Sequence, residues 1–158
     1  MRRVNLTDPE TTIDPDDPPG HRAEMYRFGK ELGARATGAS LYVIAPGEGG
    51  SPYHYEHGEE EWLLVLEGRP SVRTPDGITE LEPLDVVFFP TGPEGAHEIR
   101  NERDVPARVL MWSNLVVPTA TSYPDSDKIG IWTGDPADDV IVPRSAAVGY
   151  WHGHPGVG

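Results

Sequence analysis

The stretch SPYHYEHGEEEWLLVLEGR, residues 51–69, decides the fold. It opens with a short alternating run, passes through a His-Gly pair that suits a turn, and continues into an apolar run that ends at a glycine. Residues two apart in a strand share a face, so Glu61 should lie on the same face as Leu63 and Val65. A carboxylate that enters a buried face alone is costly, so we expect Glu61 to be paired, hydrogen-bonded or bound to an ion.

Similar short runs lie on both sides of this stretch, with Gly, Pro and Asp between them and no convincing helix. They are GASLYVIAPG (38–47), PSVRTP (70–75), ITELEP (78–83), DVVFFP (85–90), HEIRN (97–101) and RVLMWSNLVV (108–117). Strands that follow one another through turns, without crossover helices, form antiparallel sheets that close on each other. The pattern therefore predicts an all-β protein of seven or eight short strands.

The two ends of the chain differ from this middle part. Residues 1–22 are rich in proline and aspartate and predict a flexible arm, and residues 23–35 predict either a short helical turn or an irregular segment. We expect an N-terminal arm over residues 1–37, a barrel over 38–118, and an irregular extension over 119–158 that packs on the barrel. A last strand is expected around residues 147–151.

Composition excludes several classes of function. Acidic residues outnumber basic ones by 26 to 13, and the formal net charge of −13 repels nucleic acid and anionic lipid. There is no cysteine, which excludes disulfides and thiolate metal sites. No apolar run is long enough for a bilayer span or a secretory leader, so we expect neither a membrane partner nor a nucleic acid partner and a cytoplasmic location.

The chemistry-bearing residues lie in two of these runs. His54 and Glu56 alternate in one strand and so share a face, Glu61 begins the next strand, and His97 opens a third with Ile99 as its same-face neighbour. A divalent cation is the simplest partner for two imidazoles and a carboxylate that point inward together. His54, Glu61 and His97 are therefore predicted metal ligands.

These residues stand in a pattern that resembles the two motifs of the cupin superfamily, G-x5-H-x-H-x3–4-E-x6-G and G-x5-P-x-G-x2-H-x3-N. The likeness covers about residues 38–118 and is greatest to small single-domain bacterial cupins of no settled activity. It implies a double-stranded β-helix, or jelly-roll, barrel. The positions that match are His54, Glu61, Gly68, Pro90, Gly92, His97 and Asn101.

The sequence departs from these motifs at several positions. Glu56 occupies the second histidine slot of the first motif, Leu84 stands where the second motif begins with glycine, the opening glycine of the first motif is displaced by one residue, and the gap from Gly92 to His97 is longer by two. Two ligand sets follow. In the first, Glu56 joins His54, Glu61 and His97; in the second, His57 supplies the imidazole. Strand alternation favours Glu56, because His57 should point outward.

The resemblance implies one divalent ion, Fe²⁺, Mn²⁺ or Zn²⁺, and a small oxygen-bearing metabolite as substrate or ligand. As an enzyme the protein would be of the dioxygenase or the isomerase and epimerase type, with Glu56 as a catalytic proton shuttle if it does not ligate the ion. The alternative is a non-catalytic barrel that binds a small ligand. The edges of small barrels and the apolar strand at 108–117 further predict a homodimer.

Overall fold

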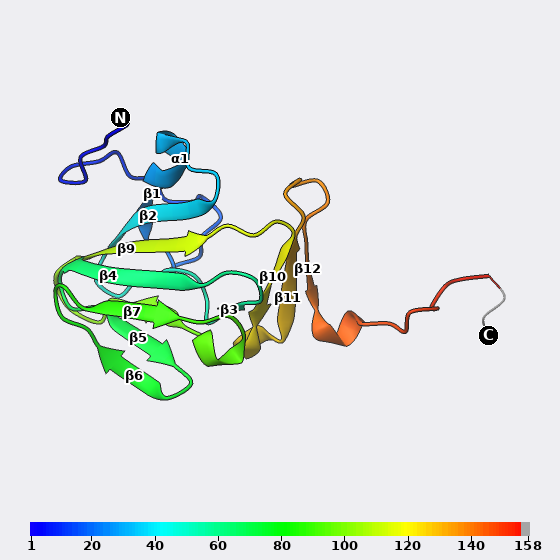
Figure 1. Cartoon of the computed structure of the whole chain (residues 1–158). Helices are drawn as coiled ribbons and strands as arrows, with labels where there is room; N and C mark the ends of the chain where they lie inside the picture. Colours follow the sequence, from blue (N-terminus) through cyan, green and yellow to red (C-terminus); the bar gives the residue numbers. More distant parts are fainter. Residues whose placement is uncertain (156–158) are drawn as a thin grey trace.

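The computed structural model describes residues 1–155, and β-strands make up most of its ordered elements (Figure 1). The strand pairs within residues 1–155 are all antiparallel, as the all-β prediction requires. No helix in these residues has the length and apolar character needed to cross a membrane. The strands are β1 Glu24–Tyr26, β2 Thr37–Ile44, β3 Tyr55–Glu56, β4 Glu61–Glu67, β5 Ser71–Thr74, β6 Gly77–Glu80, β7 Val86–Phe89, β8 Glu98–Arg100, β9 Ala107–Asn114, β10 Thr119–Tyr123, β11 Lys128–Trp132 and β12 Val140–Pro143.

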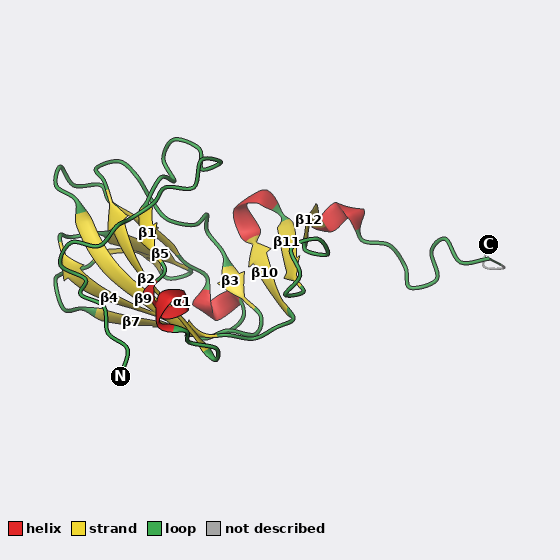
Figure 2. Ribbon diagram, turned by 90° about the horizontal axis from the view of Figure 1, so that it is seen from above, coloured by secondary structure: helices red, strands yellow, loops and turns green. Residues whose placement is uncertain are grey.

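These strands form three antiparallel sheets. The largest has the order β1-β2-β9-β4-β7, a small one has the order β6-β5-β8, and a third has the order β12-β11-β10-β3. Figure 2 shows the third sheet standing at one end of the other two. Strand β3 belongs to this third sheet although it directly precedes β4 of the largest one. The segment that decides the fold therefore joins the end sheet to the barrel.

The core lies between the largest sheet and the small one, where the alternate residues of each strand meet. Leu63, Val65 and Val109 are fully buried on the inner face, and Val72 and Ile99 of the small sheet pack against the same cluster. The other face of the largest sheet carries Trp62 opposite Trp112 in register, with the two rings stacked 6.1 Å apart. This alternation follows the period of two expected from residues 51–69.

The closing glycine of the first motif has a clear structural cause. Gly68 has a φ of 79°, and a Cβ at this position would lie 2.7 Å from the Cα of Ala107. Both the left-handed backbone and the close approach of the neighbouring strand exclude a larger residue. The glycine thus allows the chain to leave β4 while passing tightly under the start of β9.

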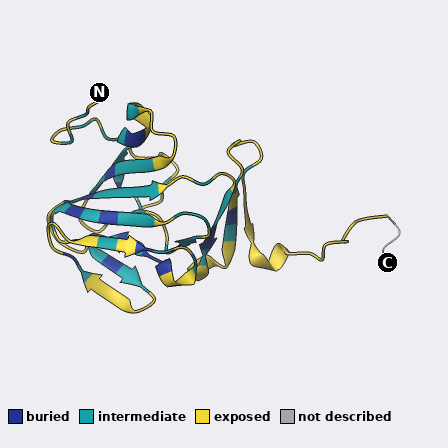
Figure 3. Cartoon of the chain, viewed as in Figure 1, coloured by how far each residue is buried: buried dark blue, intermediate teal, exposed yellow. Residues whose placement is uncertain are grey.

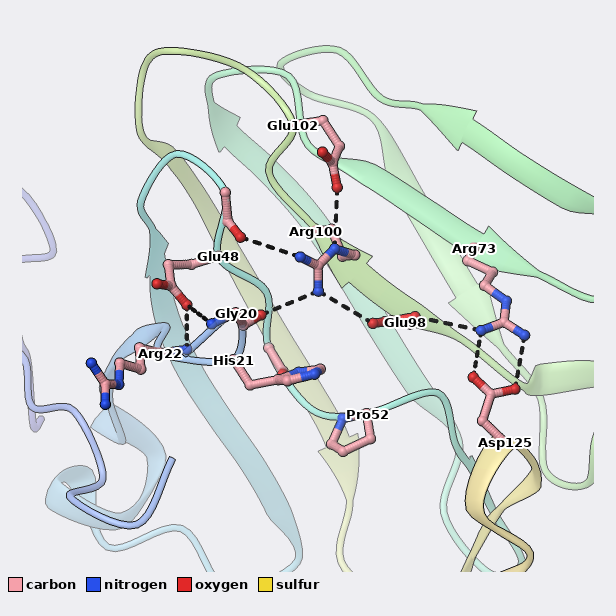
Figure 4. Close-up of polar contacts among 12 residues, drawn as sticks. Gly20, His21, Arg22, Glu48, Pro52, Arg73, Glu98, Arg100, Glu102 and Asp125 are labelled. Carbon is pink, nitrogen blue, oxygen red and sulfur yellow. Dashed lines mark hydrogen bonds and ion pairs between the residues drawn. The ribbon is translucent and has the colours of Figure 1, made fainter. Parts of the chain in front are cut away.

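The N-terminal segment, expected to be a flexible arm, has fixed partners in the structure. Strand β1 pairs with β2, and the short helix α1, Phe28–Leu32, follows it. Glu48 accepts hydrogen bonds from the backbone N–H groups of Gly20 and Arg22, at 2.8 and 2.9 Å (Figure 4). Arg100 donates to the carbonyl of Gly20 at 3.1 Å. These contacts tie the segment to the barrel.

The C-terminal extension differs in part from the prediction. Residues 119–132 form the antiparallel pair β10 and β11, and β12 adds to them at Val140–Pro143. The strand predicted around residues 147–151 is wrong: after the single-turn helix η3, Arg144–Ala146, residues 147–149 are irregular and a turn covers 150–153, and residues 147–151 are all exposed (Figure 3). Val148, Tyr150 and Trp151 are apolar, but within residues 1–155 no strand pairs with this segment.

Candidate metal centre

His54 and His97 lie side by side because their backbones are hydrogen-bonded to each other. The N–H of His54 donates to the carbonyl of His97 at 3.1 Å, and the N–H of His97 donates to the carbonyl of His54 at 2.8 Å. This two-way bridge joins segments 43 residues apart in the sequence. The single-turn helix η1, Pro93–Gly95, lies between β7 and His97 and sets the chain in position for the bridge. Both side chains are buried, and their ring centroids are 4.7 Å apart.

A backbone carbonyl fixes the orientation of each imidazole ring by contact with its Nδ1 atom. Nδ1 of His54 lies 2.8 Å from the carbonyl oxygen of Pro52, and Nδ1 of His97 lies 2.9 Å from that of Gly95. A carbonyl can only accept, so each Nδ1 carries the proton and each Nε2 keeps its lone pair. The ring of Phe89 stacks on His97 with centroids 3.7 Å apart and fixes its plane. Each Nε2 atom therefore has a lone pair with which it can coordinate a metal ion.

Glu61 completes the group from the start of β4. Its Oε2 lies 3.8 Å from Nε2 of His54 and 3.7 Å from Nε2 of His97, too far for a hydrogen bond. One donor atom from each of the three residues lies within 4.8 Å of the other two. An ion about 2.0–2.2 Å from each ligand atom can bridge ligand atoms up to about 4.4 Å apart, so the distances from Glu61 Oε2 to the two Nε2 atoms suit a single ion.

Burial makes the three side chains favour their uncharged forms. Burial, then the neighbouring Glu56 and Glu59, raises the pKa of Glu61 to about 8. Burial, then His54, lowers the pKa of His97 to about 3, and burial lowers the pKa of His54 as well. Nε2 of His97 is one of two buried side-chain polar atoms in residues 1–155 without a hydrogen-bond partner. An unpartnered imidazole nitrogen beside a buried carboxylate fits a cation at their common point.

Glu56 lies outside this three-residue group. Its two oxygens lie 2.8 and 2.9 Å from the hydroxyl of Thr121, which also accepts a hydrogen bond from Nε1 of Trp132 at 2.7 Å. The cause is the pairing of β3 with β10, which places Glu56 opposite Thr121. Burial raises the pKa of Glu56 to about 7, and its charge acts on Glu61, so it stands near the group without belonging to it.

His57 and Glu59 have other partners. Nε2 of His57 lies 2.9 Å from the hydroxyl of Ser122, on the side of the end sheet. Glu59 accepts hydrogen bonds from the hydroxyl of Ser113 and the N–H of Val116, at 3.2 and 3.0 Å. Neither side chain belongs to the group of His54, Glu61 and His97.

The three residues open into a pocket of 130 Å³ on the inner face of the largest sheet. Sequence reasoning did not single out the rest of its lining, which includes Ser40 and Tyr42 of β2, Met111 of β9 and Ser51 of the β2–β3 loop. Strand alternation within residues 38–44 could have found the first two, because Ser40, Tyr42 and Ile44 share the inner face. The apolar wall and the hydroxyls together make a site for a small molecule beside the candidate ion.

Asn101, the last residue of the second motif, has a structural role. It is fully buried, and its amide NH₂ donates to the carbonyls of Ile44 and Val105, both at 2.8 Å. Its side-chain oxygen accepts from the N–H of Arg103 at 3.0 Å. The side chain therefore holds together the end of β2 and the loop before β9, and it does not reach the metal group.

Comparison with known proteins supports this reading of the fold. A family model described as "Cupin domain" matches residues 40–113. A sugar phosphate isomerase of the cupin superfamily from Silicibacter pomeroyi has a TM-score of 0.81 at 22% identity, over 92% of this chain and 95% of that one. A candidate sugar phosphate isomerase from Acidithiobacillus ferrooxidans has a TM-score of 0.76 at 25% identity, over 83% and 82% of the two chains.

A more distant structural relative has a different activity. The polyketide cyclase RemF from Streptomyces resistomycificus has a TM-score of 0.60 at 24% identity, over 72% of this chain and 79% of that one. No curated protein matches the sequence. The likeness therefore establishes the barrel, and the activity has to be argued from the site.

Proposed function

The chain belongs to the cupin superfamily, and from this premise we propose that it is a metal-dependent enzyme that holds one divalent ion with His54, Glu61 and His97 and acts on a small oxygen-bearing metabolite. The observation that carries the proposal is the convergence of two lone-pair nitrogens and one carboxylate oxygen inside a pocket. Fe²⁺, Mn²⁺ and Zn²⁺ all accept such a set of nitrogen and oxygen ligands.

The chain's own residues orient the metal ligands and exclude water from one side of the site. The backbone bridge between His54 and His97 fixes the two imidazoles, and Phe89 covers one face of His97. A bound ion would supply either Lewis-acid polarisation of a carbonyl or hydroxyl oxygen or, as Fe²⁺, activation of dioxygen. Glu56 remains our prediction for the acid–base residue. It is half-buried, its charge acts on Glu61, and its hydrogen bond with Thr121 holds it beside the metal group and outside it.

Metal titration of single variants tests this assignment. We expect His97→Ala to lower the affinity for Mn²⁺ and Zn²⁺ by at least about 100-fold, because even the loss of an outer partner of a ligand costs 10–100-fold. Isothermal titration calorimetry on chelator-treated protein measures the affinities, and elemental analysis of protein purified without chelator identifies the native ion.

His57→Ala is the matched control, since His57 lies outside the group, and it should bind metal as the unmodified protein does. Glu56→Gln should retain the affinity within about threefold if Glu56 moves protons and should lose it if Glu56 is a ligand. Equal affinity in the unmodified protein and His97→Ala would refute the proposal and leave a non-catalytic binding barrel. With Fe²⁺ bound, oxygen consumption separates dioxygenase from isomerase chemistry.

We also propose that the protein is a homodimer. Strand β12 is the outer strand of its sheet, and its apolar residues Val140, Ile141 and Val142 are exposed. An unpaired strand edge with apolar side chains is a surface that a second copy can cover.

A further inference from the structure

The pocket beside the metal group offers hydroxyl groups as its hydrogen-bonding surface. Ser40 and Tyr42 line it from β2, and Ser51 lines it from the loop after that strand. No hydrogen bond within residues 1–155 engages the Tyr42 hydroxyl, although the ring is mostly buried and lies close enough to Glu61 to feel its charge. A hydroxyl at the pocket surface without an internal partner has both a donor and an acceptor to offer to a ligand.

The pocket lacks the side chains that bind phosphate. Neither a lysine nor an arginine is among its described lining residues, whereas the carboxylate of Glu61 is. Proteins recognise phosphate groups chiefly with arginine, lysine and backbone N–H groups at helix N-termini, and a phosphate dianion beside a carboxylate without such partners is poorly solvated. The one favourable charge for an anion would be that of the ion itself.

The arginines nearest to the pocket do not add a free positive charge to it. On the outer face of the small sheet, Arg73 binds Asp125 with two hydrogen bonds of 2.6 and 2.9 Å, and Arg100 binds Glu102 at 3.1 Å (Figure 4). Both arginines also lie 3.6 Å from Glu98, which stands between them. Their charges are therefore neutralised on the outside of the barrel.

A second cavity on the far side of Tyr42 contains one more arginine. Arg27 lines it, but so do Asp14 and Asp17, and both Arg27 and Asp17 act electrostatically on Tyr42. One cation beside two carboxylates leaves no surplus positive charge. A phosphate that reached through the pocket toward this cavity would thus meet a net negative environment.

We infer that the substrate is a small uncharged molecule with neighbouring hydroxyl and carbonyl oxygens, bound at the metal group and by the hydroxyls of Tyr42 and Ser40, and that it carries no phosphate. The inference rests on the proposed function and narrows it. Apolar walls from Ile44, Val109 and Met111 limit the molecule in size, in a pocket of 130 Å³.

The matched pair dihydroxyacetone and dihydroxyacetone phosphate tests the inference, because the two probes differ only in the phosphate. We expect the Zn²⁺-loaded protein to bind dihydroxyacetone at least about tenfold more tightly than its phosphate, a difference of about 1.4 kcal/mol. Shifts of backbone NMR signals in ¹⁵N-labelled protein measure both affinities. Tighter binding of the phosphate ester, or no binding of dihydroxyacetone, would overturn the inference.

Two tyrosine variants locate the binding. Tyr42→Phe should weaken dihydroxyacetone at least about threefold, because it removes the hydroxyl and keeps the ring. Tyr53→Phe is the control, since Tyr53 packs under Arg73 on the outer face and does not line the pocket. An unchanged affinity in Tyr42→Phe also counts against the inference. Failure of the unmodified protein to take up Zn²⁺ is a separate result, because it refutes the proposed function before any probe is added.

Discussion

Glu61 binds a proton more tightly in the folded chain than in the unfolded one, because burial raises the pKa of its carboxyl from 4.5 to about 8. Between these values the folded, ion-free protein holds more protons than the unfolded chain, so its stability falls as the pH rises. His97 acts in the opposite direction at lower pH. Its pKa falls from 6.5 to about 3 on folding, so its contribution to the stability of the folded protein increases with pH only up to about 6.5.

We therefore expect the Tm of ion-free protein to fall by about 2–6 °C between pH 6.5 and pH 8. Glu56, with a pKa of about 7, contributes to the lower part of this range in the same direction. A divalent ion replaces the proton on Glu61, so Mn²⁺ should raise the Tm more at pH 8 than at pH 6.5. Scanning calorimetry with and without Mn²⁺ measures both effects. Glu61→Gln should flatten most of the decline, and a Tm that rises over this interval would show that Glu61 is not protonated in the folded protein.

The turn that leads into β7 contains a local backbone strain that the sequence motif points to. Leu84 stands where the second cupin motif has glycine, and its φ is 75°. The left-handed region costs a residue with a Cβ about 1–2 kcal/mol, whereas glycine adopts it freely but loses more entropy on folding. The side chain is 76% exposed, so its removal sacrifices little apolar burial.

We expect Leu84→Gly to stabilise the protein by about 0.5–1 kcal/mol, because the relief of strain exceeds the entropic cost of glycine. Urea unfolding followed by tryptophan fluorescence measures the change. Val105→Gly is the control: Val105 is also an exposed loop residue, but its φ is not positive, and it should lose stability. A loss of stability in both variants would mean that Leu84 contributes packing that its exposure does not reveal.

At the scale of single strands, the sequence predicted the features that depend only on neighbouring residues. Alternation placed Leu63, Val65 and Glu61 on the inner face of β4, and the turn residues separated most of the strands correctly. It could not place Glu56, because the side chain's direction depends on the pairing of β3 with β10, about 65 residues later in the chain. The strand expected at 147–151 was wrong for a related reason, since an apolar segment becomes a strand only where a partner edge is available.

The protein as a whole combines a buried site in the middle of the sequence with an exposed strand edge, β12, in the C-terminal extension. The site needs His54, Glu61 and His97 from three segments, and the barrel brings them together through pairings within one chain. Nothing in the described metal group requires a second copy. Dimer formation is therefore expected to be separable from metal binding, and a variant that disrupts one should leave the other intact.

Strand β12 provides the place to test this separation. Ile141 is 51% exposed on the outer strand of its sheet, and a lysine on an edge strand opposes pairing with another chain. We expect Ile141→Lys to convert the dimer into the 17.3 kDa monomer while leaving the Mn²⁺ affinity unchanged. Multi-angle light scattering at micromolar concentration and calorimetric titration measure the two properties. Val148→Lys, which places the same charge on an exposed residue beyond β12, should remain dimeric. If the unmodified protein is already monomeric, the dimer proposal is wrong, and if Ile141→Lys stays dimeric, the interface lies elsewhere than on β12.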